Sequence, residues 1–248
     1  MGAVHMMWIR QLKRYFRSKS RIAGSLGQPL LFMLAFGFGL GPIFQKAGQG
    51  NYIEFLVPGV ISMTLLFTSI FSGIEIIWDR QFGFLKETLV APVSRLSIMI
   101  GRTLGGASLA VMQGIFVMLL SLIIGFKILS MSTLLLALIF MILIALAFTA
   151  LGTAIASRMQ DFQGFQMIMN FLVMPLFFLS GAMFPLDGLP KLFNIIVRLN
   201  PLSYGVDGLR GALTGVYYYG VVMDLTVLIV VAAIFTVLGS VLFSKIEV

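Results

Sequence analysis

Apolar residues run along this chain in long stretches without charge, and these stretches predict its secondary structure. Six windows of at least 20 residues contain no Asp, Glu, Lys or Arg: 22–45, 55–74, 103–126, 128–157, 162–186 and 225–244. A helix needs about 20 apolar residues to cross the roughly 30 Å hydrocarbon core of a bilayer. Strands of a membrane barrel would be about 10 residues long with alternating polarity. The pattern therefore predicts an all-α integral membrane protein with six transmembrane helices.

The segment ahead of the first window has a different pattern. Trp8, Leu12 and Tyr15 recur at helical spacing, and basic residues keep the same spacing on the other face. A basic amphipathic helix of this kind lies in the headgroup plane of a membrane. We therefore expect a cytoplasmic interfacial helix over 1–21 and a transmembrane domain over 22–248. The spans are expected at about 22–45, 55–77, 103–126, 130–157, 164–184 and 222–244.

Composition supports this class, and charge gives an orientation. The chain is 59% hydrophobic and 10% charged, whereas a soluble domain has about 25% charged residues. Twelve Lys and Arg lie on the side that holds both termini, and five lie on the other: Lys46, Lys127, Lys191, Arg198 and Arg210. The positive-inside rule then places both termini in the cytoplasm. The net charge of +8 is explained by this topology, so no nucleic-acid partner is expected.

Several kinds of chemistry lack their residues in this sequence. The chain has no cysteine and a single histidine, His5, so disulfides, thiolate sites and a zinc site built by this chain are not expected. No lysine follows a glycine as in a P-loop, so the usual phosphate cradle for ATP is missing. No acidic residue lies at the middle of a span, where ion-driven carriers keep coupling groups. We therefore expect no catalytic, cofactor-binding or metal-binding residues, and an energy source outside this chain.

A charged, amphipathic segment interrupts the apolar pattern after the second span. Residues 78–95 read WDRQFGFLKETLVAPVSR and mix charged side chains with phenylalanine, leucine and valine. A loop that was merely solvated would not need two phenylalanines and a tight Ala-Pro stop. The segment is therefore a candidate for a contact with another protein.

Two further regions depart from plain apolar helices. The fifth window contains Asn170, Pro175, Ser180 and Gly181, which interrupt its helix. The proline predicts a kink, either as a tolerated bend or as part of a path through the membrane. The segment 185–221 after it is apolar, has a helical period and contains an Asn-Pro stop. It predicts short helices that dip into the outer leaflet.

These two regions resemble a known family. The stretch WDRQFGFLKETLVAPVSRLSIMIGRTLGG is similar to a family pattern of a charged turn, a short helix and an AP-[VL]-SR motif. The stretch PLFFLSGAMFPLDGLPKLFNIIVRLNPLSYGVDGLRGAL is similar to its SG…FP…LP…NPL-[ST]-Y…D…R signature. Both patterns belong to the type-2 ABC exporter permeases, the membrane subunits of ATP-binding-cassette exporters of drugs, polysaccharides and lipids. The resemblance covers nearly the whole chain.

The resemblance implies partners and a division of labour. Two permeases pair, as a homodimer or a heterodimer, and two ABC ATPase subunits that bind ATP and magnesium dock beneath them. The segment between spans 2 and 3 becomes the coupling helix, and the segment between spans 5 and 6 becomes an outer re-entrant helical hairpin. The chain itself would be a transport subunit, not an enzyme, in the plasma or inner membrane.

The resemblance also assigns roles to residues. The expected ATPase-docking residues are Phe84, Leu85, Lys86, Glu87, Leu89 and Arg95. The expected hinge-bracing residues are Glu75, Asp79 and Arg80. The expected residues of the translocation path or gate are Asn170, Pro175, Ser180 and Gly181. The expected residues of the outer hairpin are Pro185, Pro190, Asn200, Pro201, Tyr204, Asp207 and Arg210, the last two as an i, i+3 pair.

Other functions stay open on the residues alone. A self-sufficient carrier or channel is disfavoured by the missing midplane charges, and a lipid-modifying membrane enzyme by the missing catalytic pair. The substrate is not identified: a drug, a lipid and a polysaccharide all stay open, although the short outer segment favours a hydrophobic or amphipathic drug or lipid.

Overall fold

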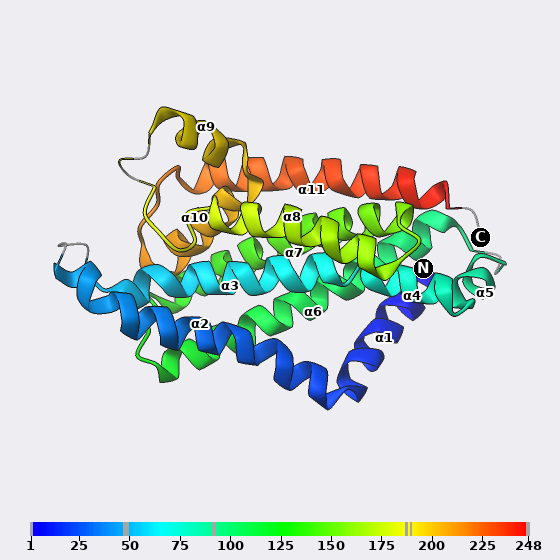
Figure 1. Cartoon of the computed structure of the whole chain (residues 1–248), viewed down its shortest axis with the longest axis horizontal. Coiled ribbons are helices and arrows are strands. Elements are labelled where there is room, and N and C mark those ends of the chain that lie inside the picture. The colour runs from blue at the N-terminus through cyan, green and yellow to red at the C-terminus, as the bar shows by residue number, and fades with distance from the viewer. Residues whose placement is uncertain (1, 47–49, 91–92, 187, 189, 247–248) are drawn as a thin grey trace.

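The computed structural model of the chain consists of helices that run side by side along one long axis (Figure 1). It describes residues 2–46, 50–90, 93–186, 188 and 190–246, without the side chains of 19–23 and 89. Within these residues the secondary structure is helical throughout, as the apolar pattern predicts. The helices are α1 (Gly2–Arg17), α2 (Lys19–Lys46), α3 (Tyr52–Phe71), α4 (Ile74–Gln81), α5 (Phe84–Val90), α6 (Arg95–Ile123), η1 (Met131–Thr133), α7 (Leu134–Arg158), α8 (Phe162–Phe178), α9 (Lys191–Leu199), α10 (Pro201–Thr214) and α11 (Val221–Ser244).

Five helical segments are long and apolar enough to cross a membrane. They are Gly24–Lys46, Tyr52–Gln81, Arg95–Ile123, Met131–Arg158 and Val221–Ser244. The chain is therefore a multi-pass membrane protein. The remaining expected span, 164–184, has a shorter counterpart in the described residues.

That counterpart is α8, which has 17 residues and so extends about 26 Å at 1.5 Å per residue. The Asp161 side chain caps its first turn by accepting a hydrogen bond from the amide of Gly164. After Leu179 the backbone turns, with Gly181 at a φ of +75°, a value that favours glycine. The turn ends the helix before the expected boundary at 184, so charge-free length alone overestimated this span.

The centre of the bundle is α3, whose residues are mostly buried among α2, α6, α7 and α10. Where α3 bends into α4, the backbones of α3 and α7 come close together. A Cβ atom on Gly73 would lie 2.4 Å from the carbonyl oxygen of Gly152, and one on Gly152 would lie 2.4 Å from that of Ile70. Only glycine permits this approach, which is how small residues bring membrane helices together.

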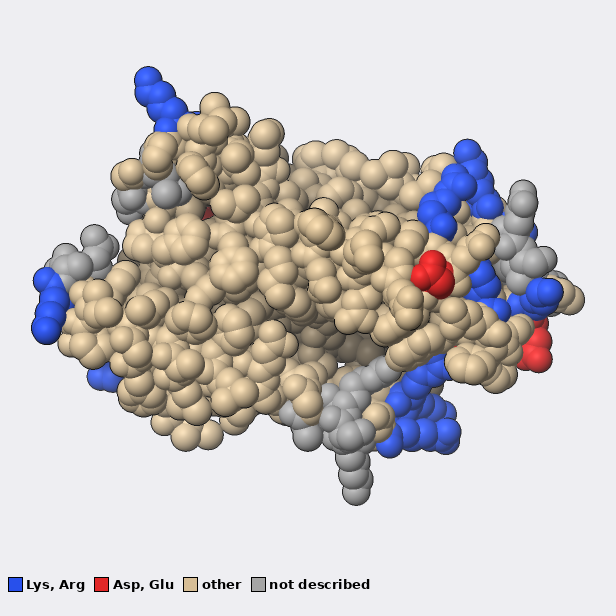
Figure 2. Space-filling view, viewed as in Figure 1, with Lys and Arg blue, Asp and Glu red and all other residues tan. Residues whose placement is uncertain are grey.

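The two ends of the bundle differ in structure and in charge. Both chain termini lie at the end that carries α4 and α5, which we call the hinge end (Figure 1). The short helices α9 and α10 lie at the opposite end, which we call the hairpin end. Lys and Arg gather at the hinge end, whereas the middle of the molecule is uncharged on the face shown in Figure 2. An uncharged belt between charged ends is the surface expected of a membrane-spanning bundle.

The outer segment folds as two short helices, as its period predicts. Asn200 ends α9 and caps α10 by accepting a hydrogen bond from the Leu202 amide at 3.0 Å, and Pro201 takes the first position of α10. Proline suits that position because its missing N–H has no partner there in any case. The stop at Asn-Pro is therefore confirmed, while the depth of the hairpin in a membrane remains a prediction.

Candidate functional site

The charged segment after the second span folds as a hinge of two short helices, α4 and α5. Gly83, with a φ of +79°, lets the chain turn between them. The segment leaves α3 through a bend at Ser72 and Gly73 and leads into α6 at Arg95. The hinge therefore connects two long helices of the bundle, α3 and α6.

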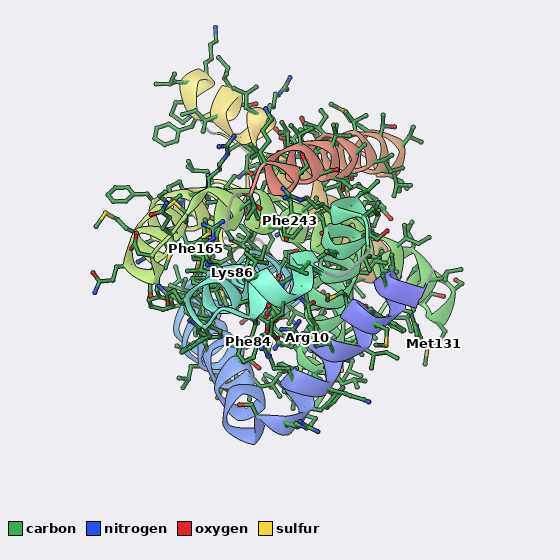
Figure 3. The ribbon with its side chains drawn as sticks, turned by 90° about the vertical axis from the view of Figure 1, so that its right-hand side faces the viewer. Arg10, Phe84, Lys86, Met131, Phe165 and Phe243 are labelled. Carbon is green, nitrogen blue, oxygen red and sulfur yellow. The ribbon has the colours of Figure 1, made fainter. Side chains whose placement is uncertain are left out.

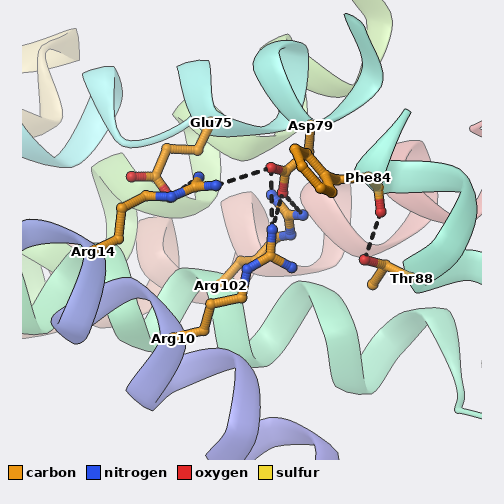
Figure 4. Close-up of polar contacts among 7 residues, drawn as sticks. All are labelled: Arg10, Arg14, Glu75, Asp79, Phe84, Thr88 and Arg102. Carbon is orange, nitrogen blue, oxygen red and sulfur yellow. Dashed lines mark hydrogen bonds and ion pairs between the residues drawn. The ribbon is translucent and has the colours of Figure 1, made fainter. Parts of the chain in front are cut away.

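The carboxylate of Asp79 is the centre of a charge cluster beneath the hinge (Figure 4). The guanidinium of Arg102 from α6 donates to it at 2.5 Å, and that of Arg10 from α1 donates to both carboxylate oxygens at 3.1 Å. Arg14, one turn further along α1, lies 3.4 Å from Asp79 and 3.5 Å from Glu75. Three arginines from two helices thus meet two carboxylates from α4.

The burial of each side chain determines how much its ion pair contributes to stability. The side chains of Asp79 and Arg102 are only 3% and 5% exposed, whereas Arg10 and Arg14 are 37% and 38% exposed. An ion pair open to water contributes about 0–1 kcal/mol. Removing one partner of a buried pair costs about 3–5 kcal/mol, because the other charge is left without compensation. The Asp79–Arg102 pair therefore fixes α4 to α6, and the α1 arginines add orientation.

Arg80 and Trp78 attach the hinge to the other side of the bundle. The guanidinium of Arg80 donates to the carbonyl oxygens of Met159 at 2.7 Å and Ser157 at 3.1 Å, at the end of α7. The Trp78 ring stacks on that of Phe162 at the start of α8, with centroids 6.4 Å apart. Among the predicted bracing residues, Asp79 thus contacts α6 and α1, Glu75 contacts α1, and Arg80 contacts the end of α7.

The outward face of the hinge carries the exposed apolar side chains. Phe82, Phe84 and Val90 are 72%, 49% and 85% exposed, and Lys86 and Glu87 lie exposed beside them. Figure 3 shows α5 across the end of the bundle, with Phe84 and Lys86 on it. We call these five residues the docking patch. An exposed cluster of this kind, apolar with a charged rim, is typical of a protein-binding surface.

Two of the expected docking residues are not free on this exposed surface. Leu85 is fully buried against the chain's own core, so it is a structural residue and not an exposed anchor. In a seven-residue helix lying on the bundle, one face must point inward, and Leu85 occupies that face. The Arg95 guanidinium is engaged by the carbonyl oxygens of Ser244 at 2.5 Å and Ile246 at 3.0 Å, which ties α6 to the end of α11. The side chain of Leu89 lies outside the described residues.

The expected path residues lie on α8 and the turn after it, away from the hinge. Asn170 and Pro175 are exposed on a face of α8 that also exposes Met167, Phe171 and Phe178. Ser180 and Gly181 are buried in the turn that ends α8. An amide side chain on an apolar face indicates a contact other than lipid, because an unpaired amide in hydrocarbon is costly.

The hairpin residues form a second polar centre at the other end. Arg210 lies over the ring of Phe55 at 4.0 Å and donates to the carbonyl oxygen of Gly181 at 2.8 Å. Burial lowers the pKa of Arg210 to about 10, an effect that the nearby Asp207 charge opposes. Asp207 instead accepts the backbone amides of Tyr218 and Tyr219. The predicted contact between Asp207 and Arg210 is therefore wrong: each has other partners.

The remaining hairpin residues position these two helices. The Tyr204 hydroxyl donates to the carbonyl oxygen of Arg198 at 2.9 Å, and the Asn200 amide donates to that of Leu176 at 2.7 Å. Pro190 precedes α9, and Pro185 lines a cavity of about 460 Å³ at this end together with Arg210. The bond from Asn200 fixes the hairpin to α8, and the bond from Tyr204 fixes α10 to α9.

The structure contains a cavity of about 540 Å³ that the sequence analysis did not predict. Its lining residues come from α1, α2, α3, α4, α6 and α8. Most of its lining is apolar or aromatic, but three lining residues form a chain of hydrogen bonds. The Thr68 hydroxyl donates to the amide oxygen of Gln113, and the amide nitrogen of Gln113 donates to the Tyr15 hydroxyl at 2.8 Å. The glutamine in the middle of an uncharged span was the signal that could have located this cavity.

The buried pair under the hinge can be tested by neutralising one side. Asp79→Asn leaves the Arg102 charge buried without a counter-ion, and we expect a loss of roughly 3–5 kcal/mol in stability. Thermal unfolding of the purified chain in detergent measures this loss. Glu87→Gln removes an exposed carboxylate from the same hinge and should leave unfolding unchanged. Adding Arg102→Met to Asp79→Asn should restore part of the stability; equal unfolding of Asp79→Asn and the unmodified chain would contradict the assignment.

Comparison with known proteins agrees with this architecture. The sequence profile of the ABC-2 type transporter family matches residues 2–214. A protein of Cyanophora paradoxa named for a transport permease, ycf38, is 31% identical over 254 residues, which cover 95% of this chain and 84% of that protein. Nodulation protein J of Rhizobium leguminosarum bv. trifolii is 28% identical over 215 residues, 84% of this chain and 81% of that protein. The chain belongs to the ABC-2 type transporter family.

Proposed function

We propose that this chain is the membrane permease of an ABC exporter and that its hinge receives the ATPase subunit. The observation that carries the proposal is the docking patch, an exposed apolar surface with a charged rim on a hinge that is braced against α1, α6 and α7. A lever needs such bracing, because force applied to α5 must reach the long helices without being lost in a loose loop. Arg95 adds the end of α11 to the parts that move with it.

In this proposal, ATP and magnesium bind to the partner and not to this chain. Two ATPase copies would dock under two permeases, one on each hinge. The exposed face of α8 is the proposed contact with the second permease, because Met167, Phe171 and Phe178 are open there beside Asn170. Pairing would cover the Asn170 amide, which the lipid would leave without a partner.

The cavity lined by α1 and α2 supports an amphipathic substrate. The substrate classes that we propose are a drug, a lipid and a lipid-linked saccharide. Its aromatic and aliphatic walls suit a hydrocarbon or ring system, and the Thr68, Gln113 and Tyr15 groups offer hydrogen bonds. A mostly apolar cavity with a few polar groups is the usual form of a small-molecule site. Export from the cytoplasm, across the plasma or inner membrane, with both termini cytoplasmic, completes the proposal.

The docking prediction is tested by one substitution at the patch. We expect Phe84→Asp to abolish copurification of an ATPase subunit that otherwise accompanies the permease at about one copy each. The reason is that a charge replaces the aromatic anchor, and interface aromatics of this kind contribute about 2 kcal/mol or more. The measurement is affinity purification of the full chain in mild detergent, expressed with its native neighbours.

Two control variants distinguish loss of docking from unfolding of the permease. Met131→Asp makes the same change at an 83% exposed residue of the hairpin end and should retain the ATPase. Leu85→Asp is expected to unfold the hinge, since Leu85 is buried. If no ATPase copurifies with the unmodified chain even after crosslinking, a self-sufficient carrier or channel becomes the better reading.

The proposed substrate site is tested by placing a bulky side chain in the lining of the cavity. Gln166→Trp places a large ring at the cavity lining and should weaken stimulation of ATP hydrolysis by amphipathic compounds about tenfold, equivalent to about 1.4 kcal/mol of lost binding. Gln163→Trp makes the same change one turn earlier on α8 at an exposed position that does not line the cavity. Equal effects of the two substitutions would contradict a substrate site in this cavity.

The orientation is tested by chemical labelling, which the absence of cysteine simplifies. Lys13→Cys on α1 and Lys46→Cys at the end of α2 each introduce a single exposed thiol. Helix α1 begins at the hinge end, and α2 ends at the opposite end of the bundle (Figure 1). A membrane-impermeant maleimide added to intact cells should label the second variant and not the first. Labelling of Lys13→Cys alone would invert the proposed topology.

A further inference from the structure

The 540 Å³ cavity proposed as the substrate site has one charged group in its lining. Of the described residues that line it, Glu75 is the only acidic one, and none is a lysine or an arginine. The Glu75 side chain is 8% exposed and comes from the first turn of α4. A carboxylate beside a mostly apolar space is costly unless a cation is near it. The charge of Glu75 therefore bears on which ligands this cavity accepts.

Aromatic rings make up much of the remaining lining. The rings of Phe67 and Phe71 are stacked with their centroids 6.2 Å apart, and those of Trp78 and Phe162 with their centroids 6.4 Å apart. All four residues line the cavity, and Trp78 lies one turn after Glu75 on α4. The face of an aromatic ring attracts a cation, and that of Trp attracts it most strongly. The rings and the carboxylate thus favour the same sign of ligand charge.

The arginines near Glu75 do not line this cavity. Arg10, Arg14 and Arg102 line a separate pocket of about 10 Å³, to which Glu75 and Asp79 also contribute. Arg10 and Arg102 donate their hydrogen bonds to the Asp79 carboxylate. Among the described residues, Glu75 is the one that the charge cluster shares with the large cavity.

The ion pair between Arg14 and Glu75 leaves room for a second cation. The guanidinium of Arg14 lies 3.5 Å from Glu75 and 3.4 Å from Asp79 (Figure 4). Arg14 is 38% exposed, and an ion pair that water reaches contributes little to stability. A ligand cation at Glu75 therefore competes with a weak contact, and Arg14 keeps Asp79 as its partner.

We infer that the cavity selects amphipathic cations and that Glu75 determines this selectivity. The inference rests on the proposed substrate site and narrows its class to a basic drug or a lipid with an amino headgroup. The apolar body of such a ligand lies among the aromatic rings, and its cationic group is directed at Glu75. An anion of the same shape is repelled by the carboxylate, because no lysine or arginine among the described lining residues offsets that charge.

The inference is tested with two ions of nearly equal size and shape and opposite charge, tetraphenylphosphonium and tetraphenylborate. Radiolabelled forms of each are bound to the purified full chain in phosphatidylcholine nanodiscs, and binding to empty nanodiscs is subtracted. We expect the unmodified chain to bind the cation about tenfold more tightly than the anion, which corresponds to about 1.4 kcal/mol.

Two substitutions should shift cation binding in opposite directions. Glu75→Gln removes the charge and nearly keeps the shape, so it should weaken binding of tetraphenylphosphonium about tenfold. Arg14→Gln removes the competing guanidinium and should strengthen it about threefold, in keeping with an ion pair that is partly open to water. Glu87→Gln neutralises an exposed carboxylate of the same hinge that does not line the cavity, and it should change neither affinity.

Equal affinity of the unmodified chain for the two ions, or cation binding that Glu75→Gln leaves unchanged, overturns the inference. The substrate site itself survives such a result if Gln166→Trp still weakens binding of both ions. Binding that is absent, or insensitive to Gln166→Trp for both ions, refutes the site and the inference together. If Glu75→Gln fails to fold, Arg14→Gln decides, because unchanged or weaker cation binding in that variant contradicts competition for Glu75.

Discussion

The buried ion pair between Asp79 and Arg102 is the contact on which the hinge end depends. A charge buried among apolar helices is stable only with a partner, and each of these two is the other's closest partner. Because Asp79 belongs to α4 and Arg102 to α6, the pair fixes the path of the hinge relative to the helix that follows it. The more exposed Arg10 and Arg14 can reach the same centre only if α1 lies across it, so the pair also determines where the N-terminal helix rests.

The two ends of the bundle solve the problem of buried charge differently. At the hinge end, opposite charges from separate helices meet, and they fix α4 to α6 and to α1. At the hairpin end, Arg210 lies over the Phe55 ring and donates to a backbone carbonyl oxygen, and Asp207 accepts hydrogen bonds from backbone amides. Next to the hinge, α3 and α7 approach so closely at Gly73 and Gly152 that no side chain separates their backbones.

The docking segment shows how far reasoning from sequence reached. Mixed charge and phenylalanines in an apolar chain located the hinge, and the exposed Phe84, Lys86 and Glu87 agree with a surface for a partner. Leu85 was misassigned because neighbouring apolar residues on a short helix look alike in sequence, and only the packing decides which face is inward. The arginines of α1 were assigned to the headgroups for a similar reason, since a helical period does not show which basic side chains find carboxylates.

Charge-free length, the positions of Lys and Arg, and the Asn-Pro stop lie in the sequence itself. They determined the membrane class, the helical content, the charged hinge and the paired short helices at the other end, because these depend on local composition and on the cost of placing charge in lipid. The partners of Asp79, the inward face of α5, the early end of α8 and the separate partners of Asp207 and Arg210 were decided only by the tertiary structure. Each joins residues that are distant along the chain or selects one face of a helix, and no local pattern specifies such a choice. Packing of whole helices against one another brings these groups together, and a polar group that is buried in this way needs a hydrogen-bond or ion-pair partner.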